Sequence, residues 1–190
     1  MRSISLIYIF ILLVTITTQS IAGSNKLPGC AIDLDITTKS YESGVSSIDI
    51  ENNRVFYTND SIYIAIIAQN VSNLDTYQAA LHYDDSKLEF IGGFEDIPIF
   101  GVINILKQNA GNTLGFQAVK LNNGVITLAN SLIGNNISDA PEGSGVIGVI
   151  GFKILSKGEC SLKLDNVYFV DSLGNKEKVI NLNNSKLIIK

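Results

Sequence analysis

Few residues in this sequence have the types and spacing that catalysis requires. His82 is the only histidine, and a hydrolase of the Ser-His-Asp type needs a histidine beside its nucleophile. The sequence has no Gly-x-Ser-x-Gly motif to present such a serine. Apolar and polar residues alternate with period two from 75 to 83, which places His82 on the solvent side of a strand. We therefore predict no catalytic residue.

The acidic residues are the other candidates for chemistry, because glycoside hydrolysis needs two carboxylates across a cleft. The candidates are Asp84, Asp85, Glu89, Glu95 and Asp96. Acidic residues in turns usually act as solvated turn formers. A calcium site is not indicated, because no Asp-x-Asp-x-Asp-Gly loop is present, and one histidine with two distant cysteines does not indicate zinc. We expect a protein that is not an enzyme, with no metal site and no cofactor.

The two cysteines, Cys30 and Cys160, have two interpretations. In an exported protein they could form one disulfide that closes a long loop, adding about 4 kcal/mol if the geometry allows. They could equally be two unrelated thiols, because sequence separation does not reveal distance in space.

The N-terminus has the form of a secretory leader. A positive Met1-Arg2 start precedes an almost wholly apolar run from 4 to 14, and small residues lead to Ala22. We predict a signal peptide over 1–22, a short segment over 23–30 and one domain over 31–190, in a secreted, extracellular or cell-surface protein. Membrane contact is expected only through an uncleaved leader, or through a lipid on Cys30, because residues 27 to 30 resemble a lipoprotein box.

Composition favours one folded, β-rich domain. The chain has 190 residues, of which 46% are hydrophobic and 17% charged, with three prolines and no tryptophan. This excludes a disordered chain, and the length suits a single domain. The net charge of −4 and the absence of a basic patch argue against nucleic acid as a partner.

The stretch from 75 to 83 is predicted to be a half-buried strand. Its core-facing positions are Tyr77, Ala79, Leu81 and Tyr83. The alternating positions are Thr76, Gln78, Ala80 and His82. Because successive strand residues point to opposite faces, the second set is expected to lie in solvent.

Similar patterns predict about nine short strands. The clearest are 31–36, 61–70, 146–155 and 161–170, the last with a bulge at Asp165-Asn166. Asn123-Gly124 between two apolar runs is a strong hairpin signal, and residues 94 to 109 are expected to be irregular. With little helix and no internal repeat, the fold class is all-β, a jelly-roll-like β-sandwich.

Three stretches carry a resemblance to a known family. The first is Tyr83-Asp84 followed by Leu88-Glu89, at the end of the strand predicted over 75 to 83. The second, residues 59 to 72, is an apolar strand between polar turns. The third, residues 143 to 167, runs from a Gly-rich segment to a strand with Phe-Lys and then to a closing hairpin. In order and spacing, residues 31 to 190 resemble the cohesin domains of bacterial cellulosomes.

This resemblance implies a dockerin-like protein module as partner, in extracellular polysaccharide-degrading assemblies. It also implies contact through two polar residues upstream of Tyr83-Asp84, which here are Thr76 and Gln78, where well-known cohesins have Asn and Asp. The resemblance thus makes the face with Thr76, Gln78, Ala80 and His82 the candidate partner-binding surface. An ordinary solvated face remains an alternative. Two other functions stay open: binding of an extracellular polysaccharide, to which a loop tyrosine such as Tyr41 could contribute, and a structural surface protein that assembles through its sheet edges.

Overall fold

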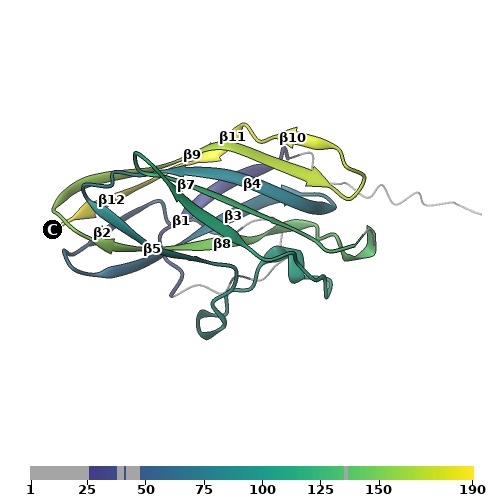
Figure 1. Cartoon of the computed structure of the whole chain (residues 1–190), viewed down its shortest axis with the longest axis horizontal. Helices are drawn as coiled ribbons and strands as arrows, with labels where there is room; N and C mark the ends of the chain where they lie inside the picture. Colours follow the sequence, from purple (N-terminus) through teal and green to yellow (C-terminus); the bar gives the residue numbers. More distant parts are fainter. Residues whose placement is uncertain (1–25, 38–40, 42–47, 135–136) are drawn as a thin grey trace, which may run out of the picture.

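The computed structural model describes residues 26–37, 41, 48–134 and 137–190, so the predicted leader lies outside the described residues. Within them, twelve strands form two sheets packed face to face, and the only helices are three short 3-10 turns (Figure 1). The predicted all-β sandwich is confirmed, with more short strands than expected. None of the helices in this part of the chain has the length and hydropathy to cross a bilayer.

One sheet has five strands. In spatial order they are β11 (Asn181–Asn183), β1 (Gly29–Asp33), β3 (Ser61–Val71), β8 (Gly143–Ile154) and β5 (Leu88–Phe94). Neighbours are antiparallel except β1 and β11, which run parallel. The first strand of the fold therefore pairs with one of the last.

The other sheet has seven strands. Its path is β2 (Asn53–Phe56), β12 (Ser185–Ile189), β9 (Gly158–Asp171), β4 (Leu74–His82), β7 (Val125–Ser131) and β6 (Gln117–Leu121), with β10 (Lys176–Lys178) also paired to β9. Only β2 and β12 are parallel. The pairing of β4 with β9 shifts register between Gln78 and Ala80, and Asn166 there has a φ of 48°, which confirms the predicted bulge.

The main core lies between the sheets. The central strand β4 contributes Tyr77, Ala79 and Leu81, each 0% exposed, and Tyr83 just beyond its end is 7% exposed. The period-two prediction for this side of the strand is therefore confirmed. Phe152 of β8 packs against Tyr83 from the opposite sheet, with ring centroids 4.9 Å apart.

A second, smaller core covers the outer side of the five-stranded sheet. The outward side chains there include Ala31, Ala65, Ile67, Val146 and Val149, all fully buried. They are covered by residues of two long connections, namely Ile36, Tyr41, Ile48, Ile50, Ile97, Phe100 and Val102. The middle of the five-stranded sheet is thus buried on both faces, which explains why β3 and β8 read as near-continuous apolar runs.

Tyr41 corrects one expectation. As a loop residue it could have been exposed and contributed to sugar binding, but it is only 5% exposed within the second core. Its hydroxyl donates hydrogen bonds to Asp33 Oδ2 at 3.0 Å and to the carbonyl oxygen of Asp35 at 2.9 Å. Burial and these nearby carboxylates raise the pKa of Tyr41. It is therefore not available for stacking on a sugar.

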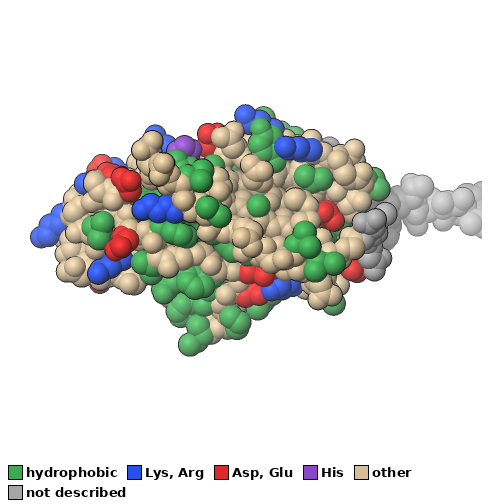
Figure 2. Space-filling model, viewed as in Figure 1, with side chains coloured by type: hydrophobic (Ala, Val, Ile, Leu, Met, Phe, Trp, Pro, Cys, Tyr) green, Lys and Arg blue, Asp and Glu red, His purple; other side chains and the backbone are tan. Residues whose placement is uncertain are grey.

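The connection between β5 and β6 is irregular, as predicted, and contains two of the 3-10 turns, Pro98–Phe100 and Ile105–Lys107. The third turn spans Ile137–Asp139. The first projects from the sandwich, closed by backbone pairing of Ile97 with Val102. Figure 2 shows hydrophobic side chains gathered on a protrusion along the lower edge, where Figure 1 has this connection. Ile99, at its tip, is 86% exposed.

Candidate functional site

The candidate site is the outer side of the seven-stranded sheet over β6, β7, β4, β9 and β10, which we call the open face. Cross-strand pairing arranges its side chains in rows. One row contains Gln117, Ala129, Gln78, Tyr168 and Lys178, and another contains Leu121, Val125, His82 and Lys163. Between these rows lies a third, formed by Val119, Thr127, Ala80 and Asp165. Three of the four predicted binding residues are at least partly accessible here: Thr76, Gln78 and His82.

Polar contacts fix two of the predicted residues on this face. The Thr76 hydroxyl lies 2.7 Å from the Ser131 hydroxyl of β7 and donates to Asp75 Oδ1 at 2.7 Å. His82 Nε2 lies 3.7 Å from Asp165 Oδ2, and both side chains are about half exposed. Gln78, at the centre of the face, is exposed.

Ala80 corrects the predicted surface. It belongs to the outward set by register but is only 7% exposed. Its methyl group lies on a central strand, flanked by the larger side chains of its cross-strand partners Thr127 and Asp165. The alternation of side chains predicts which face of the sheet a residue lies on, but not whether larger neighbouring side chains cover it. Ala80 therefore contributes no direct contact surface.

The two flanks of the open face differ in chemistry. Over β6, Val119 and Leu121 are 50% and 46% exposed. Over β9 and β10, the Lys176 ammonium lies 4.0 Å from the ring centroid of Tyr168, a cation–π contact. This lysine occupies a face of the ring on which a sugar could have stacked.

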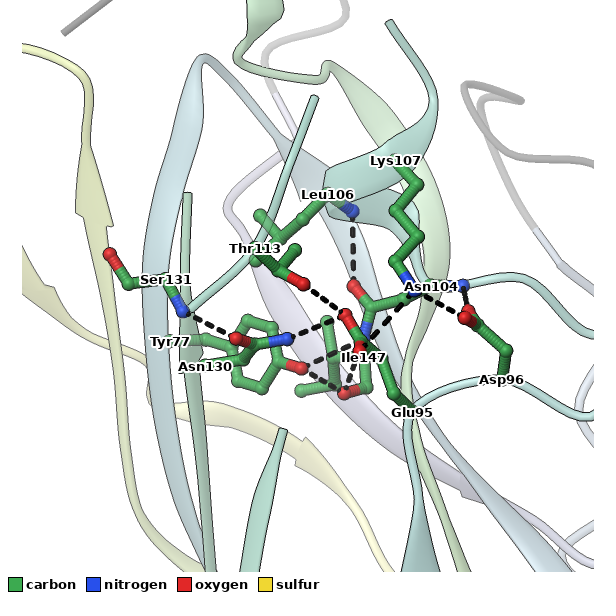
Figure 3. A network of polar contacts seen from close by, with 10 residues as sticks. All are labelled: Tyr77, Glu95, Asp96, Asn104, Leu106, Lys107, Thr113, Asn130, Ser131 and Ile147. Atoms are coloured by element: carbon green, nitrogen blue, oxygen red, sulfur yellow. Dashed lines mark hydrogen bonds and ion pairs between the residues drawn. The ribbon is translucent and has the colours of Figure 1, made fainter. Parts of the chain in front are cut away.

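A buried polar network connects β4 to the opposite sheet (Figure 3). The Tyr77 hydroxyl donates to the carbonyl oxygen of Ile147 on β8. Asn104 Nδ2 donates to the Tyr77 hydroxyl at 2.8 Å and to the same carbonyl oxygen at 3.0 Å, while Asn104 Oδ1 accepts from the N–H of Leu106 at 3.0 Å. Because Tyr77 lies between Thr76 and Gln78, the network holds the centre of the open face from below.

Glu95 continues this network toward the surface. Its Oε1 accepts from Asn130 Nδ2 at 2.9 Å and from the Thr113 hydroxyl at 2.6 Å (Figure 3). Its Oε2 lies 3.3 Å from Lys107 Nζ, which also pairs with Asp96. Partial burial alone would lower the pKa of Lys107, but the two carboxylates outweigh it and raise the pKa. The lysine therefore stays charged, so it serves as an anchor and not as a base.

One feature of the sequence indicates this buried polar network. In β7 the inward positions are Ile126, Leu128 and Asn130, and Asn130 is only 5% exposed. A polar residue at the third place of an apolar alternation requires a buried partner. The identity of that partner, Glu95, depends on long-range packing and is not visible in the sequence.

The cysteines do not form the suggested disulfide, because both are free and buried. Cys30 is on β1 in one sheet, and Cys160 is on β9 in the other. Burial raises the pKa of the Cys30 thiol to about 12. A lipid on Cys30 does not fit this arrangement, because its side chain is 0% exposed inside a strand paired on both edges.

No constellation for catalysis or metal binding appears among the described residues. None of their His, Cys, Asp and Glu side chains form a group of three that could hold a metal ion. Asp84 accepts hydrogen bonds from the N–H and hydroxyl of Ser86, and the hydroxyl contact in particular lowers the pKa of Asp84. Glu95 and Asp96, the other adjacent pair, are bound to Lys107. These carboxylates act in turns and in the network.

Comparison with known proteins gives relatives by structure only. No family model matches the sequence, and no curated protein matches it. Among solved structures, a non-cellulosomal cohesin from Archaeoglobus fulgidus is similar, with a TM-score of 0.58 and 15% identity over 86% of this chain and 91% of that one.

Two cellulosomal structures are equally similar. The sixth cohesin of scaffoldin B from Acetivibrio cellulolyticus, solved in complex with a Cel5 dockerin, has a TM-score of 0.59 and 15% identity over 86% of this chain and 99% of that one. The OlpC cohesin from Clostridium thermocellum, in complex with the Doc435 dockerin, has a TM-score of 0.59 and 15% identity over 86% and 94%. The chain therefore has the fold of the cohesin modules, as its sequence pattern indicated.

Proposed function

We propose that this protein is a non-catalytic module that binds another protein, of the dockerin type, on the open face. The observation that carries the proposal is the asymmetry of the two sheets. Connections cover the outer side of the five-stranded sheet and form a second core there. The outer side of the seven-stranded sheet carries partly accessible Thr76, Gln78 and His82 instead.

The support underneath the open face fits a binding role. Preorganised surfaces lose less conformational entropy when a partner docks. Tyr77, Asn104 and Ile147 hold β4 through buried hydrogen bonds, and Thr76 is tied to Ser131 on the neighbouring strand. Protein partners also occur in solved structures of the same fold, since two of the three described above are complexes with dockerins.

Glycan binding is less well supported. Flat aromatic platforms are the usual means of stacking on sugars, and on the open face Tyr168 already lies under the Lys176 ammonium. Tyr41 is buried. We further propose that the protein acts outside the cell, where its partner would belong to a polysaccharide-degrading assembly, in keeping with the leader predicted over residues 1 to 22.

The test is affinity capture from the secreted proteins of the source organism, in calcium and again in a chelator, because dockerins resemble calcium-loop modules that fold on metal. Mass spectrometry should identify a protein with a dockerin-like module that is retained only in calcium. Gln78→Arg should weaken binding of that protein at least about tenfold, since it places a long charged side chain at the centre of a packed interface.

The matched control is Glu89→Arg, an exposed position on β5 of the other sheet, which should leave binding unchanged. Failure to retain any dockerin-bearing protein in calcium would reject the proposal. Equal binding by wild type and Gln78→Arg would reject the open face as the site.

A further inference from the structure

The protruding part of the connection between β5 and β6 is apolar and uncharged. Residues 97–106 contain no charged side chain. Ile99 is 86% exposed and Ile103 is 41% exposed, although aliphatic side chains of this size are most often buried. Figure 2 shows the hydrophobic side chains that gather on this protrusion. We call residues 97–103 the apolar tip.

The charged residues that border this uncharged stretch are paired with each other. Asp96 precedes the stretch and Lys107 follows it, and their side chains form an ion pair. The Lys107 ammonium also contacts Glu95 Oε2 at 3.3 Å. Asp96 Oδ1 accepts a hydrogen bond from the N–H of Asn104 at 2.8 Å. The charges at the base of the apolar tip are therefore neutralised locally, and the surface that projects is aliphatic.

The apolar tip satisfies most of its own backbone donors. Pro98 has no N–H, and the N–H groups of Ile97, Phe100, Gly101 and Val102 donate to carbonyl oxygens within the loop at 2.9 to 3.2 Å. A segment that enters lipid must make its backbone hydrogen bonds internally, because hydrocarbon offers no partners. The loop is thus built to lose contact with water at little cost.

The apolar tip is fixed to the sandwich on the side away from the open face. Val102 is fully buried in the second core, on the outer side of the five-stranded sheet, and Phe100 packs against the same core. In Figure 1 the protrusion lies beyond β5 and β8, whereas β4 and β9 of the open face lie on the other side. A surface that receives the tip therefore leaves the open face free.

The chemistry of the apolar tip decides between a second copy, a protein pocket and a bilayer as its occupant. A second copy is a poor match, because clefts of this chain have charged linings, such as Asp35 with Arg54 in one and Asp171 with Lys176 in another. A protein pocket offers hydrogen-bond partners and opposite charges, for which the tip has no use. A bilayer requires an uncharged projection with a satisfied backbone, which the tip provides.

We propose that the apolar tip inserts into the interfacial region of a lipid bilayer, with Ile99 deepest and Ile103 beside it. Removal of aliphatic surface from water drives the contact. Anionic lipids are not needed, because the tip carries no cation and the chain has a net charge of −4. This contact differs from the two that the sequence suggested, a retained leader and a lipid on Cys30. It goes beyond the proposed function and turns the open face away from the membrane, toward a partner in solution.

The test uses the fact that the chain has no tryptophan, so Ile99→Trp introduces a single fluorophore at the apolar tip. Protein expressed from the full-length chain is mixed with phosphatidylcholine vesicles whose acyl chains carry bromine, a quencher. The emission should shift to shorter wavelength and lose at least about half of its intensity, because an interfacial tryptophan lies next to the acyl chains.

The matched control is Leu173→Trp, at a residue that is 73% exposed in the turn between β9 and β10. It should show neither the shift nor the quenching. Because each fluorophore reports on its own position, attachment of the chain through a leader does not imitate the expected pair of results.

Gly101→Asp, combined with Ile99→Trp, places a charge on the apolar tip. Gly101 has a φ of 69° and no atom within 4 Å of its Cβ position, and Asp adopts this conformation more readily than most residues. The added charge should weaken vesicle binding at least about tenfold, because a carboxylate is costly to move toward the acyl chains. Urea unfolding of the variant checks that it is folded.

Absence of quenching at position 99, or equal quenching at positions 99 and 173, would overturn the inference. Quenching that requires phosphatidylglycerol in the vesicles would overturn insertion without charge attraction. If secreted proteins of the source organism shield the tryptophan introduced at position 99 and vesicles do not, the occupant is a protein and the lipid assignment is wrong.

Discussion

The N–H of Tyr83 donates a hydrogen bond to the carbonyl oxygen of Gly124 at 2.8 Å. This bond ties the end of β4 to the tip of the β6–β7 hairpin. Gly124 has a φ of 67°, and a Cβ atom built on it would lie 2.1 Å from the Tyr83 carbonyl oxygen. Both the backbone conformation and the available space therefore require glycine here.

Gly124→Ala should destabilise the protein by at least about 2 kcal/mol, because the left-handed conformation and the clash with backbone add together. Gly101→Ala is the matched control, since Gly101 has a φ of 69° and no atom within 4 Å of its Cβ position. It should lose only about 1 kcal/mol. Urea unfolding of both variants checks the difference, and equal losses would show that the clash is relieved.

Asn104→Ala should destabilise the protein by about 2–3 kcal/mol. The substitution removes three buried hydrogen bonds, and each contributes about 1 kcal/mol net. Tyr77→Phe should lose only about 1 kcal/mol, because Asn104 Nδ2 still reaches the Ile147 carbonyl oxygen. Asn112→Ala, at an exposed position in the same connection between β5 and β6, serves as control for loss of an asparagine side chain and should change the unfolding free energy little.

Ile99→Ala should change the unfolding free energy by less than about 0.5 kcal/mol, because Ile99 is 86% exposed at the tip of its loop. Val102→Ala in the same loop should lose about 2 kcal/mol, because Val102 is 0% exposed in the second core. A small effect at Val102 would mean that the loop does not pack on the five-stranded sheet in solution.

The unfolding free energy should fall as pH rises above about 9, partly through Cys30. Burial raises the pKa of this thiol to about 12, so the folded protein keeps a proton that the unfolded chain releases. The contribution of this thiol to the unfolding free energy is fully present below its ordinary pKa. As the pH rises from that value toward the pKa in the folded state, the contribution is lost by up to about 1.4 kcal/mol per pH unit. The raised pKa values of Tyr77 and Tyr41 act in the same direction at higher pH.

Cys30→Ala should therefore show a shallower decline of stability between about pH 9 and 10, where the tyrosines contribute little. Ile32→Val, a milder substitution on the same buried strand, should lower stability without a change in the pH slope. An unchanged slope in Cys30→Ala would exclude the thiol as the titrating group.

Much of the fold could be predicted from local patterns. Alternation in residues 75 to 83 gave the buried side of β4, Asn123-Gly124 marked the hairpin, and Asp165-Asn166 marked the bulge. Each of these depends on residues close together in the sequence. Backbone geometry at such places is set by local sterics, so the sequence is informative.

The errors concern what covers a residue. Ala80 is buried by taller neighbours on two other strands, and Tyr41 by a second core assembled from distant connections. Cys30 lies inside a strand that pairs with β11 near the other end of the chain, and both cysteines are free. The burial of these residues depends on how distant strands and connections pack together, and the periodicity of the sequence carries no information on that packing.

The parallel pairing of early with late strands, β1 with β11 and β2 with β12, has a mechanical consequence. If tension pulls β1 from its start and β12 from its end, the strands of each parallel pair are drawn along their length in opposite directions. The hydrogen bonds of each ladder then bear the load together instead of opening one at a time. Resistance to force would thus come from the parallel pairing of early with late strands, and a module with this topology could hold a partner under tension.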